Sequence, residues 1–330
     1  MTGDKGMDQK ERVAIKLCIK SNADYVKKWL TYMKLFEPKE MKFKKYKNGK
    51  FVSYKKNVFG EEVDRELKGK EYDIFLQGDQ NCINCIKTNN NQVIRLLAII
   101  NYSTFIDHEN DIYLLINEIM SEVGIVARIV SLEDNFWQTN MDVDYYLNEN
   151  KSLEGIPLKK HPIFQNEKAV DVEKLPGYET QIENIWFGAA WKMWFNDEYY
   201  QFVSREAIAD FEDCYSNAKI STNCRCITLY SHVLDYNKSE NRQKQWNFKS
   251  AIKFQEIVEN LKQINKPMEG TVNVEILNGE FEHGGIKKIL VYLDDNNNSI
   301  SKAQASKIRV TEYNSKGKIV WESMEVCNRI

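Results

Sequence analysis

The first forty residues combine a strand-like and a helix-like spacing of apolar positions. Residues 13–19 alternate in the way expected of a β-strand. Ser21 followed by Asp24 forms an approximate capping box for a helix. The apolar positions that follow recur at helical spacing, and they form the expected buried stripe: Val26, Trp29, Leu30 and Met33. We expect this helix to end before Pro38, so a strand and a helix open the chain.

Residues 41–56, MKFKKYKNGKFVSYKK, contain Asn48-Gly49 between two alternating runs. Asn-Gly is the strongest short-range signal for the two-residue turn of a β-hairpin. Such a turn would place Tyr46 opposite Phe51. A hairpin is therefore predicted after the first helix.

Residues 72–100 contain two strand-like runs, YDIFLQ at 72–77 and VIRLLAII at 93–100. An amphipathic helix is then predicted, because apolar residues follow at helical spacing: Ile112, Leu115, Ile116, Ile119, Met120 and Val123. Gly124 stops this helix, and IVARIVSL at 125–132 is the next strand. This order predicts an α+β fold with helices on one face of mixed or antiparallel sheets, and a ferredoxin-like topology for the N-terminal part.

Residues 133–180 lack a sustained period and hold three of the five prolines. We interpret residues 136–180 as an irregular connection between two α+β domains, residues 1–135 and residues 181–330. The last sixty residues consist of short alternating runs separated by Asn, Gly and Ser. They predict that the second domain ends in an antiparallel β-meander.

The composition indicates an ordinary globular protein, with 42% hydrophobic and 28% charged residues. No apolar run has the length of a signal peptide or a spanning helix, so no contact with a membrane is expected. The seven cysteines are an odd number in a chain long enough to fold without disulfides. A reducing compartment, the cytoplasm, is the expected location.

The formal net charge of -2 conceals a separation of charge along the chain. Residues 41–60 hold seven lysines and no acid, whereas residues 131–213 hold 17 acids and 7 bases, a net charge of -10. Two regions of opposite charge are expected to attract different partners.

The cysteines suggest one metal hypothesis, with a CxxC and a CxC as the four thiolates of a zinc site: Cys82, Cys85, Cys224 and Cys226. Strand residues two apart lie about 6.6 Å from each other, given a rise of about 3.3 Å per residue. That separation does not suit two sulfurs on one ion unless the strand bends, so burial as small apolar residues is the favoured interpretation. No metal and no cofactor are expected.

Catalytic motifs are missing from the sequence. The four histidines are scattered, and GxSxG, HExxH, P-loop and GxGxxG patterns are absent. The sequence therefore favours a protein without enzymatic activity.

The lysine-rich hairpin at 41–56 offers an alternative hypothesis, a nucleic-acid-binding protein or a nuclease-type enzyme, because basic residues interleaved with aromatic ones can contact phosphates and stack on bases. The candidate residues are Lys44, Lys45, Tyr46, Lys47, Lys50 and Phe51. The alternative is a solvated sheet edge on which lysines prevent association of strands.

Residues 186–202, WFGAAWKMWFNDEYYQF, are the most aromatic stretch of the chain and lie within its acidic region. They could form a core, or a platform for a partner, because Tyr and Trp favour protein interfaces and an acidic field attracts a basic partner. We choose the second as the working hypothesis: an immunity or antitoxin-like protein that binds a basic protein, such as a toxin nuclease. The residues expected to bind this partner are Trp191, Trp194, Tyr199 and Tyr200, with Asp197, Glu198, Asp210, Glu212 and Asp213 supplying the charge.

Overall fold

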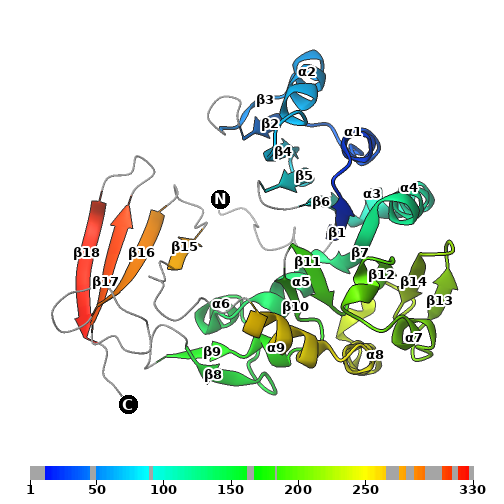
Figure 1. Cartoon of the computed structure of the whole chain (residues 1–330). Coiled ribbons are helices and arrows are strands. Elements are labelled where there is room, and N and C mark those ends of the chain that lie inside the picture. The colour runs from blue at the N-terminus through cyan, green and yellow to red at the C-terminus, as the bar shows by residue number, and fades with distance from the viewer. Residues whose placement is uncertain are drawn as a thin grey trace. The chain divides into compact units, whose positions relative to one another are not determined.

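The chain divides into two compact units, Met1–Glu259 and Asn260–Ile330. The computed structural model describes residues 12–44, 50–88, 92–161, 167–182 and 184–264, and four strands beyond them (Figure 1). The division lies downstream of the predicted connection at 136–180, and strands from both predicted domains belong to one sheet of the first unit. The α+β class is confirmed by a large antiparallel sheet and its helices.

The first unit is built on a ten-stranded sheet with the order β13-β14-β12-β7-β1-β6-β5-β4-β2-β3. Every pair of neighbours in it is antiparallel. Its strands are β1 (Arg12–Lys20), β2 (Glu40–Phe43), β3 (Val52–Ser53), β4 (Tyr72–Gln77), β5 (Cys82–Lys87), β6 (Val93–Asn101), β7 (Gly124–Ser131), β12 (Lys192–Phe195), β13 (Ser216–Lys219) and β14 (Arg225–Thr228). The strands expected at 13–19, 72–77, 93–100 and 125–132 are therefore present.

The centre of this sheet has the ferredoxin-like arrangement expected from the sequence. Strands β7, β1, β6 and β5 are neighbours in that order, so β1 and β5 run parallel, as do β6 and β7. Helices connect each parallel pair, which gives the βαββαβ pattern. Strands β2, β3 and β4 and helix α2 (Lys56–Glu66) are inserted between the first helix and β5.

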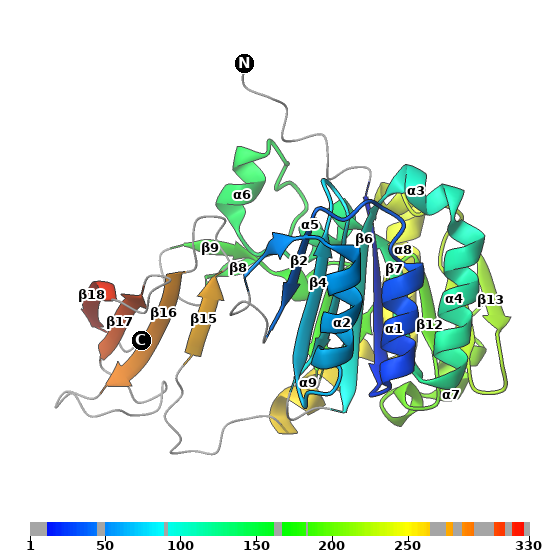
Figure 2. The same ribbon diagram turned by 90° about the horizontal axis from the view of Figure 1, so that it is seen from above.

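One face of the sheet is covered by α1 (Ala23–Tyr32), α2, α3 (Tyr102–Asp107) and α4 (Glu109–Glu122). Figure 2 shows α1, α2 and α4 side by side along this face. The stripe predicted for α4 is buried from Ile112 to Met120, and the buried stripe of α1 is also as predicted. Asn22, rather than Ser21, caps α1, because its side chain accepts hydrogen bonds from the backbone of Asp24 and Tyr25.

The opposite face is also covered where it meets β1, β7 and β12. Helix α5 (Leu132–Thr139) contacts β1 and β7, and Phe248 of α8 (Ser239–Ala251) stacks on Phe195 of β12. A hairpin of β10 (Glu179–Ile182) and β11 (Ile185–Gly188) packs on the same face. Helices thus lie on both faces rather than on one, and this explains why β7 is buried along its whole length.

The remaining elements of the first unit are shorter. They are α6 (Val143–Asn148), β8 (Leu158–Lys160), β9 (Lys168–Val170), η2 (Val172–Lys174), η3 (Tyr199–Gln201), α7 (Arg205–Ala209), η4 (Asp235–Asn237) and α9 (Phe254–Ile264). The second unit contains the expected antiparallel meander, formed by β15 (Glu275–Gly279), β16 (Ile286–Leu293), β17 (Lys307–Tyr313) and β18 (Ile319–Val326). Within the described part of the chain, no helix has the length and apolar character needed to cross a membrane.

Candidate protein-binding site

The aromatic stretch is part of the core. Trp191, Trp194 and Tyr199 are all buried. Trp194 Nε1 donates a hydrogen bond to Asn117 Oδ1 of α4 at 2.8 Å, and Trp191 Nε1 donates to the carbonyl of Tyr230 at 2.7 Å. The expectation that these three rings anchor a partner is therefore corrected, since none of them is accessible. The runs AWKMWF at 190–195 and YYQFV at 199–203 predict a hairpin around residues 196–198, and this prediction is also wrong, because η3 and α7 follow β12.

The β10–β11 hairpin packs on β7, with Phe187 stacked on Tyr199, and is held there by a buried carboxylate. Glu179 forms ion pairs with Lys16 of β1 and Arg128 of β7. Burial raises the pKa of Glu179, but the attraction of Lys16 and Arg128 outweighs it and lowers the pKa to about 2. Gly188 permits the close approach: its φ is 138°, and a Cβ there would lie 2.7 Å from the carbonyl oxygen of Tyr178.

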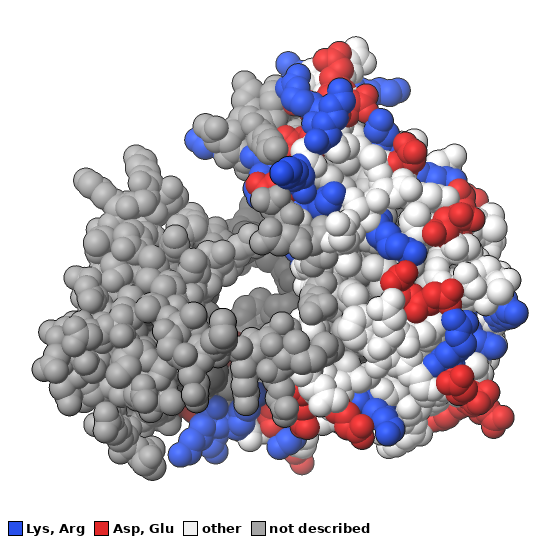
Figure 3. Space-filling model, viewed as in Figure 1, with Lys and Arg blue, Asp and Glu red and all other residues white. Residues whose placement is uncertain are grey.

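The acids near the aromatic stretch are largely neutralised by their neighbours. Asp197 pairs with Arg205. The remaining pairs join Glu198 to Lys20 at 3.1 Å and Asp213 to Lys244 at 3.2 Å. Figure 3 shows basic and acidic side chains interspersed over the visible face rather than gathered into one acidic surface.

Three other residues expected at this surface remain at least partly accessible. Tyr200 is half-buried beneath the guanidinium of Arg205, which lies 4.4 Å from its ring centroid. Asp210 and Glu212 are exposed. Without the three buried rings, however, these residues do not form the aromatic platform that the sequence suggested.

The lysine-rich hairpin is only partly described, since Lys45, Tyr46 and Lys47 lie outside the described residues. Met41 pairs with Val52, so the register differs from that of a two-residue turn at 48–49. Of the remaining candidates, Lys44 pairs with Glu71 at 3.0 Å and Lys50 is exposed.

Phe51 is 42% exposed, and its ring meets that of Phe75 edge to face, with the centroids 5.4 Å apart. Lys42 lies over both rings and pairs with Asp73 at 3.3 Å. This part of the hairpin matches a sheet edge with locally paired lysines more closely than a phosphate-binding surface.

The four cysteines of the zinc hypothesis are not brought together. Cys82 and Cys85 belong to β5, whereas Cys224 and Cys226 lie at β14, and β12, β7, β1 and β6 separate the two strands. Burial raises the pKa of each of these thiols. Among the described residues, no group of three or more His, Cys, Asp and Glu side chains could hold a metal ion.

A second aromatic cluster lies in the region that the sequence suggested to be irregular. We call residues 136–178 the aromatic lobe; they comprise the end of α5, and α6, β8, β9 and η2. The lobe has a small core of its own, formed by Tyr146, Val170, Val172 and Leu175. In Figures 1 and 2 its α6 and its β8–β9 hairpin lie apart from α1, α2 and α4.

Rings on α5 and α6 contact each other in the lobe but are only partly covered. The ring centroid of Tyr145 lies 5.1 Å from that of Phe136 and 5.9 Å from that of Trp137. Phe136 and Trp137 are half-buried, and Tyr145 is 39% exposed. Three further large apolar residues of the lobe are exposed: Met141, Leu147 and Leu158.

Carboxylates surround this apolar surface. Four exposed acids belong to the same segment: Asp142, Asp144, Glu149 and Glu154. None of them forms an ion pair within the part of the chain that the structure describes, whereas Lys151 is occupied by Glu133 at 2.9 Å. The segment around α6 thus combines exposed apolar side chains with negative charge, whereas the β8–β9 hairpin carries the exposed lysines Lys160 and Lys168.

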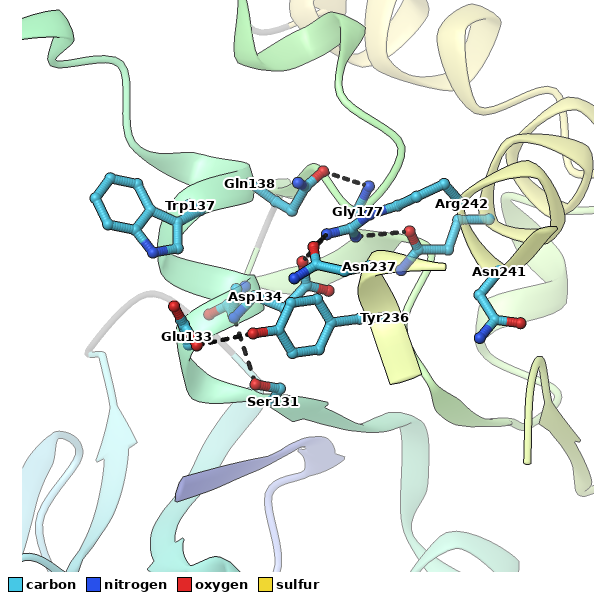
Figure 4. Close-up of polar contacts among 12 residues, drawn as sticks. Ser131, Glu133, Asp134, Trp137, Gln138, Gly177, Tyr236, Asn237, Asn241 and Arg242 are labelled. Carbon is cyan, nitrogen blue, oxygen red and sulfur yellow. Dashed lines mark hydrogen bonds and ion pairs between the residues drawn. The ribbon is translucent and has the colours of Figure 1, made fainter. Parts of the chain in front are cut away.

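A buried polar network fixes the lobe to α8, as Figure 4 shows. Glu133 accepts hydrogen bonds from Tyr236 at 2.8 Å and from Lys151 of the lobe. Asp134 pairs with Arg242 of α8 at 2.6 Å. Burial raises the pKa of Asp134, and Arg242 opposes this increase.

The same network reaches the other end of the lobe. The backbone amide of Gly177 donates a hydrogen bond to Gln138 Oε1 at 2.8 Å. A Cβ at Gly177 would lie 2.7 Å from Cγ of Gln138, so a larger residue would displace this side chain. The rings of α5 are therefore presented by a scaffold that is fixed at several points.

Sequence reasoning missed the lobe and its network. One signal was present, because Ser131 and Asp134 have the spacing of a capping box, and the Ser131 side chain does accept a hydrogen bond from the Asp134 amide. No sequence pattern indicated that Tyr236 and Arg242, about a hundred residues away, would bind the acids of α5.

Comparison with known proteins gives little further guidance. No family model matches the chain, and no curated protein matches it either. Among solved structures, it is similar to the Pseudomonas aeruginosa T6SS protein PA0821, with a TM-score of 0.47 and 9% identity over 74% of this chain and 73% of that one. This likeness is too weak to transfer a function.

Proposed function

We propose that this protein is a cytoplasmic binding protein of the immunity or antitoxin type, which neutralises a basic partner such as a toxin nuclease. The aromatic lobe covers the positive surface of that partner. The main support is the set of exposed apolar residues Met141, Tyr145, Leu147 and Leu158, together with four exposed carboxylates of the same segment that form no ion pair with a described residue and that we take as the rim of the site.

The chemistry of the lobe fits this role. Aromatic and Met side chains are enriched at protein interfaces, where a few apolar anchors at the centre carry most of the binding energy. Exposed acids at the rim attract a basic partner and accelerate its association. The fixed scaffold beneath α5 reduces the entropy lost on binding, because these side chains are already ordered.

The decisive experiment measures binding to a basic protein recovered with the tagged full chain from its native cell. We expect the double substitution Tyr145→Ala, Leu147→Ala to weaken binding at least tenfold, because it truncates two central anchors. Isothermal titration with the purified partner measures the dissociation constant. Growth of cells that express the partner with either form of this protein measures neutralisation.

A matched control is available on the other side of the sheet. Tyr32 of α1 and Leu114 of α4 are 59% and 67% exposed, more than either lobe residue. The substitutions Tyr32→Ala, Leu114→Ala should leave the dissociation constant unchanged. Equal loss of binding in both double variants, or no loss in the lobe variant, would contradict the proposal.

Nucleic-acid binding through the lysine-rich hairpin is the alternative function. Its described lysines Lys42 and Lys44 are ion-paired with Asp73 and Glu71, which leaves less positive charge for phosphates. No described contact favours this alternative over the lobe.

A further inference from the structure

Lys249 of α8 is enclosed by aromatic rings. Its side chain is buried, with 3% of the residue exposed, and the ring centroids of Tyr178, Trp246 and Phe254 lie 5.6, 4.7 and 4.5 Å from its Nζ. Nζ donates a hydrogen bond to the carbonyl of Leu175 at 3.0 Å. Among the described residues, Lys249 forms no ion pair.

Lys249 also lines a cavity of about 240 Å³, together with Trp246, Ser250, Lys253 and Phe254. This volume is below the usual range for drug-sized ligands and suits a molecule of a few heavy atoms. The cavity lies at the turn between α8 and α9. Here Lys253 has a φ of 53°, a left-handed conformation that costs energy for a residue other than glycine.

The surroundings of Lys249 favour its neutral form. Burial lowers the pKa of its ammonium to about 8, and attraction to Glu173 opposes this effect. The ring faces compensate in part for the lost water. The other charged groups at the cavity are Lys253 and Glu256, which pair with each other at 3.7 Å. Near neutral pH, a larger fraction of Lys249 is therefore unprotonated than of an exposed lysine.

We propose that Lys249 is a reactive amine that forms an imine with a small aldehyde or ketone admitted by this cavity. The neutral Nζ adds to the carbonyl carbon, the carbonyl oxygen takes up a proton, and loss of water leaves a C=N bond. The step requires no oxidant or reductant. It assigns a covalent binding site to α8 where this helix contacts the end of the lobe, since Leu175 and Tyr178 belong to the lobe.

The test traps the imine in the full chain. The protein is treated with acetaldehyde and cyanoborohydride at pH 7, and mass spectrometry of its peptides follows ethylation at each lysine. We expect Lys249 to react about tenfold faster than Lys253, because its larger neutral fraction outweighs its enclosed position. Lys253 is the internal control, since it lines the same cavity and is exposed.

The pH profile gives a second readout. The rate at Lys249 should rise with pH and level off above about 8, where the amine is mostly neutral, while the rate at Lys253 keeps rising. The substitution Lys249→Arg keeps the charge and removes the amine, so fast labelling of this peptide should disappear. A wild-type chain in which Lys253 reacts as fast as Lys249 would overturn the proposal.

Discussion

The two aromatic clusters of this protein differ in what covers them. The stretch around β12 lies between α4 on one face and α8 on the other, with Phe187 of β11 stacked on Tyr199, and its rings are buried. The rings of the aromatic lobe are only partly covered. Tyr146 lies in the lobe core, whereas Tyr145, the preceding residue in α6, is 39% exposed. A high density of aromatic rings in the sequence therefore does not indicate a binding surface. Packing against segments that are distant in the sequence determines whether the rings are exposed.

The acids near the two clusters differ in the same way. Around β12, three of the five acids are ion-paired with Lys20, Arg205 and Lys244, whereas Asp210 and Glu212 are exposed and form no ion pair with a described residue. Around the lobe, Asp142 and Asp144 are exposed and form no ion pair with a described residue. Each of these carboxylates counts as one negative charge in the sequence, whether or not it is ion-paired. The sequence does not reveal which carboxylates are ion-paired, and ion pairing determines how much unbalanced negative charge remains on each surface.

The largest effect is expected from removing a ring of the buried cluster. Trp194→Ala should destabilise the protein by about 4 kcal/mol. It leaves a cavity, and it removes the indole N–H that donates a hydrogen bond to Asn117 Oδ1. Chemical denaturation measures this change. Leu147→Ala in the lobe is the control and should change the free energy of unfolding by less than about 0.5 kcal/mol. Equal effects of the two substitutions would mean that the clusters do not differ in burial.

Low pH should release the β10–β11 hairpin from the sheet. The pKa of Glu179 is lowered from 4.5 to about 2 in the folded protein. A carboxylate with a lowered pKa stabilises the fold fully above its unfolded pKa, so this contribution is lost as the pH falls from about 4.5 towards 2. We expect unfolding in this range, and tryptophan fluorescence can follow it because Trp186 lies in β11.

The variant Glu179→Gln tests whether this carboxylate is responsible. It leaves Lys16 and Arg128 buried without their acid and should cost about 3 kcal/mol at pH 7. Its stability should also depend less on pH below 4.5. Glu198→Gln, which removes the acid of an exposed pair with Lys20, is the control and should have little effect. An unchanged acid transition in Glu179→Gln would show that another group controls it.

Much of the fold could be predicted from local patterns. The alternation at 13–19 and the apolar stripe of α4 depend on neighbouring residues only, and both led to the observed elements. The domain boundary could not be predicted in this way, because the strands β12 and β14 join a sheet whose other members lie far away in the sequence. Short elements such as α6 and β8 have too few residues to show a period.

The candidate site was harder to predict than the fold. The sequence placed the binding surface within the acidic region 131–213, and the lobe lies there. It selected the densest run of rings, however, and that run forms the core because α4 and α8 pack against its two faces. Glu179 holds this hairpin through partners at Lys16 and Arg128, which are distant in sequence.

The smallest expected effect concerns the rim of the lobe. Asp142→Asn, Asp144→Asn removes two exposed negative charges and should slow association with the basic partner several-fold at low salt, because rim charges act mainly on the association rate. The dissociation rate should change little. Stopped-flow or surface binding at several salt concentrations measures both rates, and the difference from wild type should shrink as salt screens the charges.

The control variant for the rim removes the same number of negative charges near α7 instead of in the lobe. Asp210→Asn, Glu212→Gln removes two exposed acids near α7, and it should leave the association rate close to that of wild type. If this control slowed association as much as the lobe variant, the partner would be attracted by the molecule's total charge. If only the control slowed association, the surface beside the buried rings would be the binding site after all. Local steering by the lobe predicts a slower rate in the lobe variant alone.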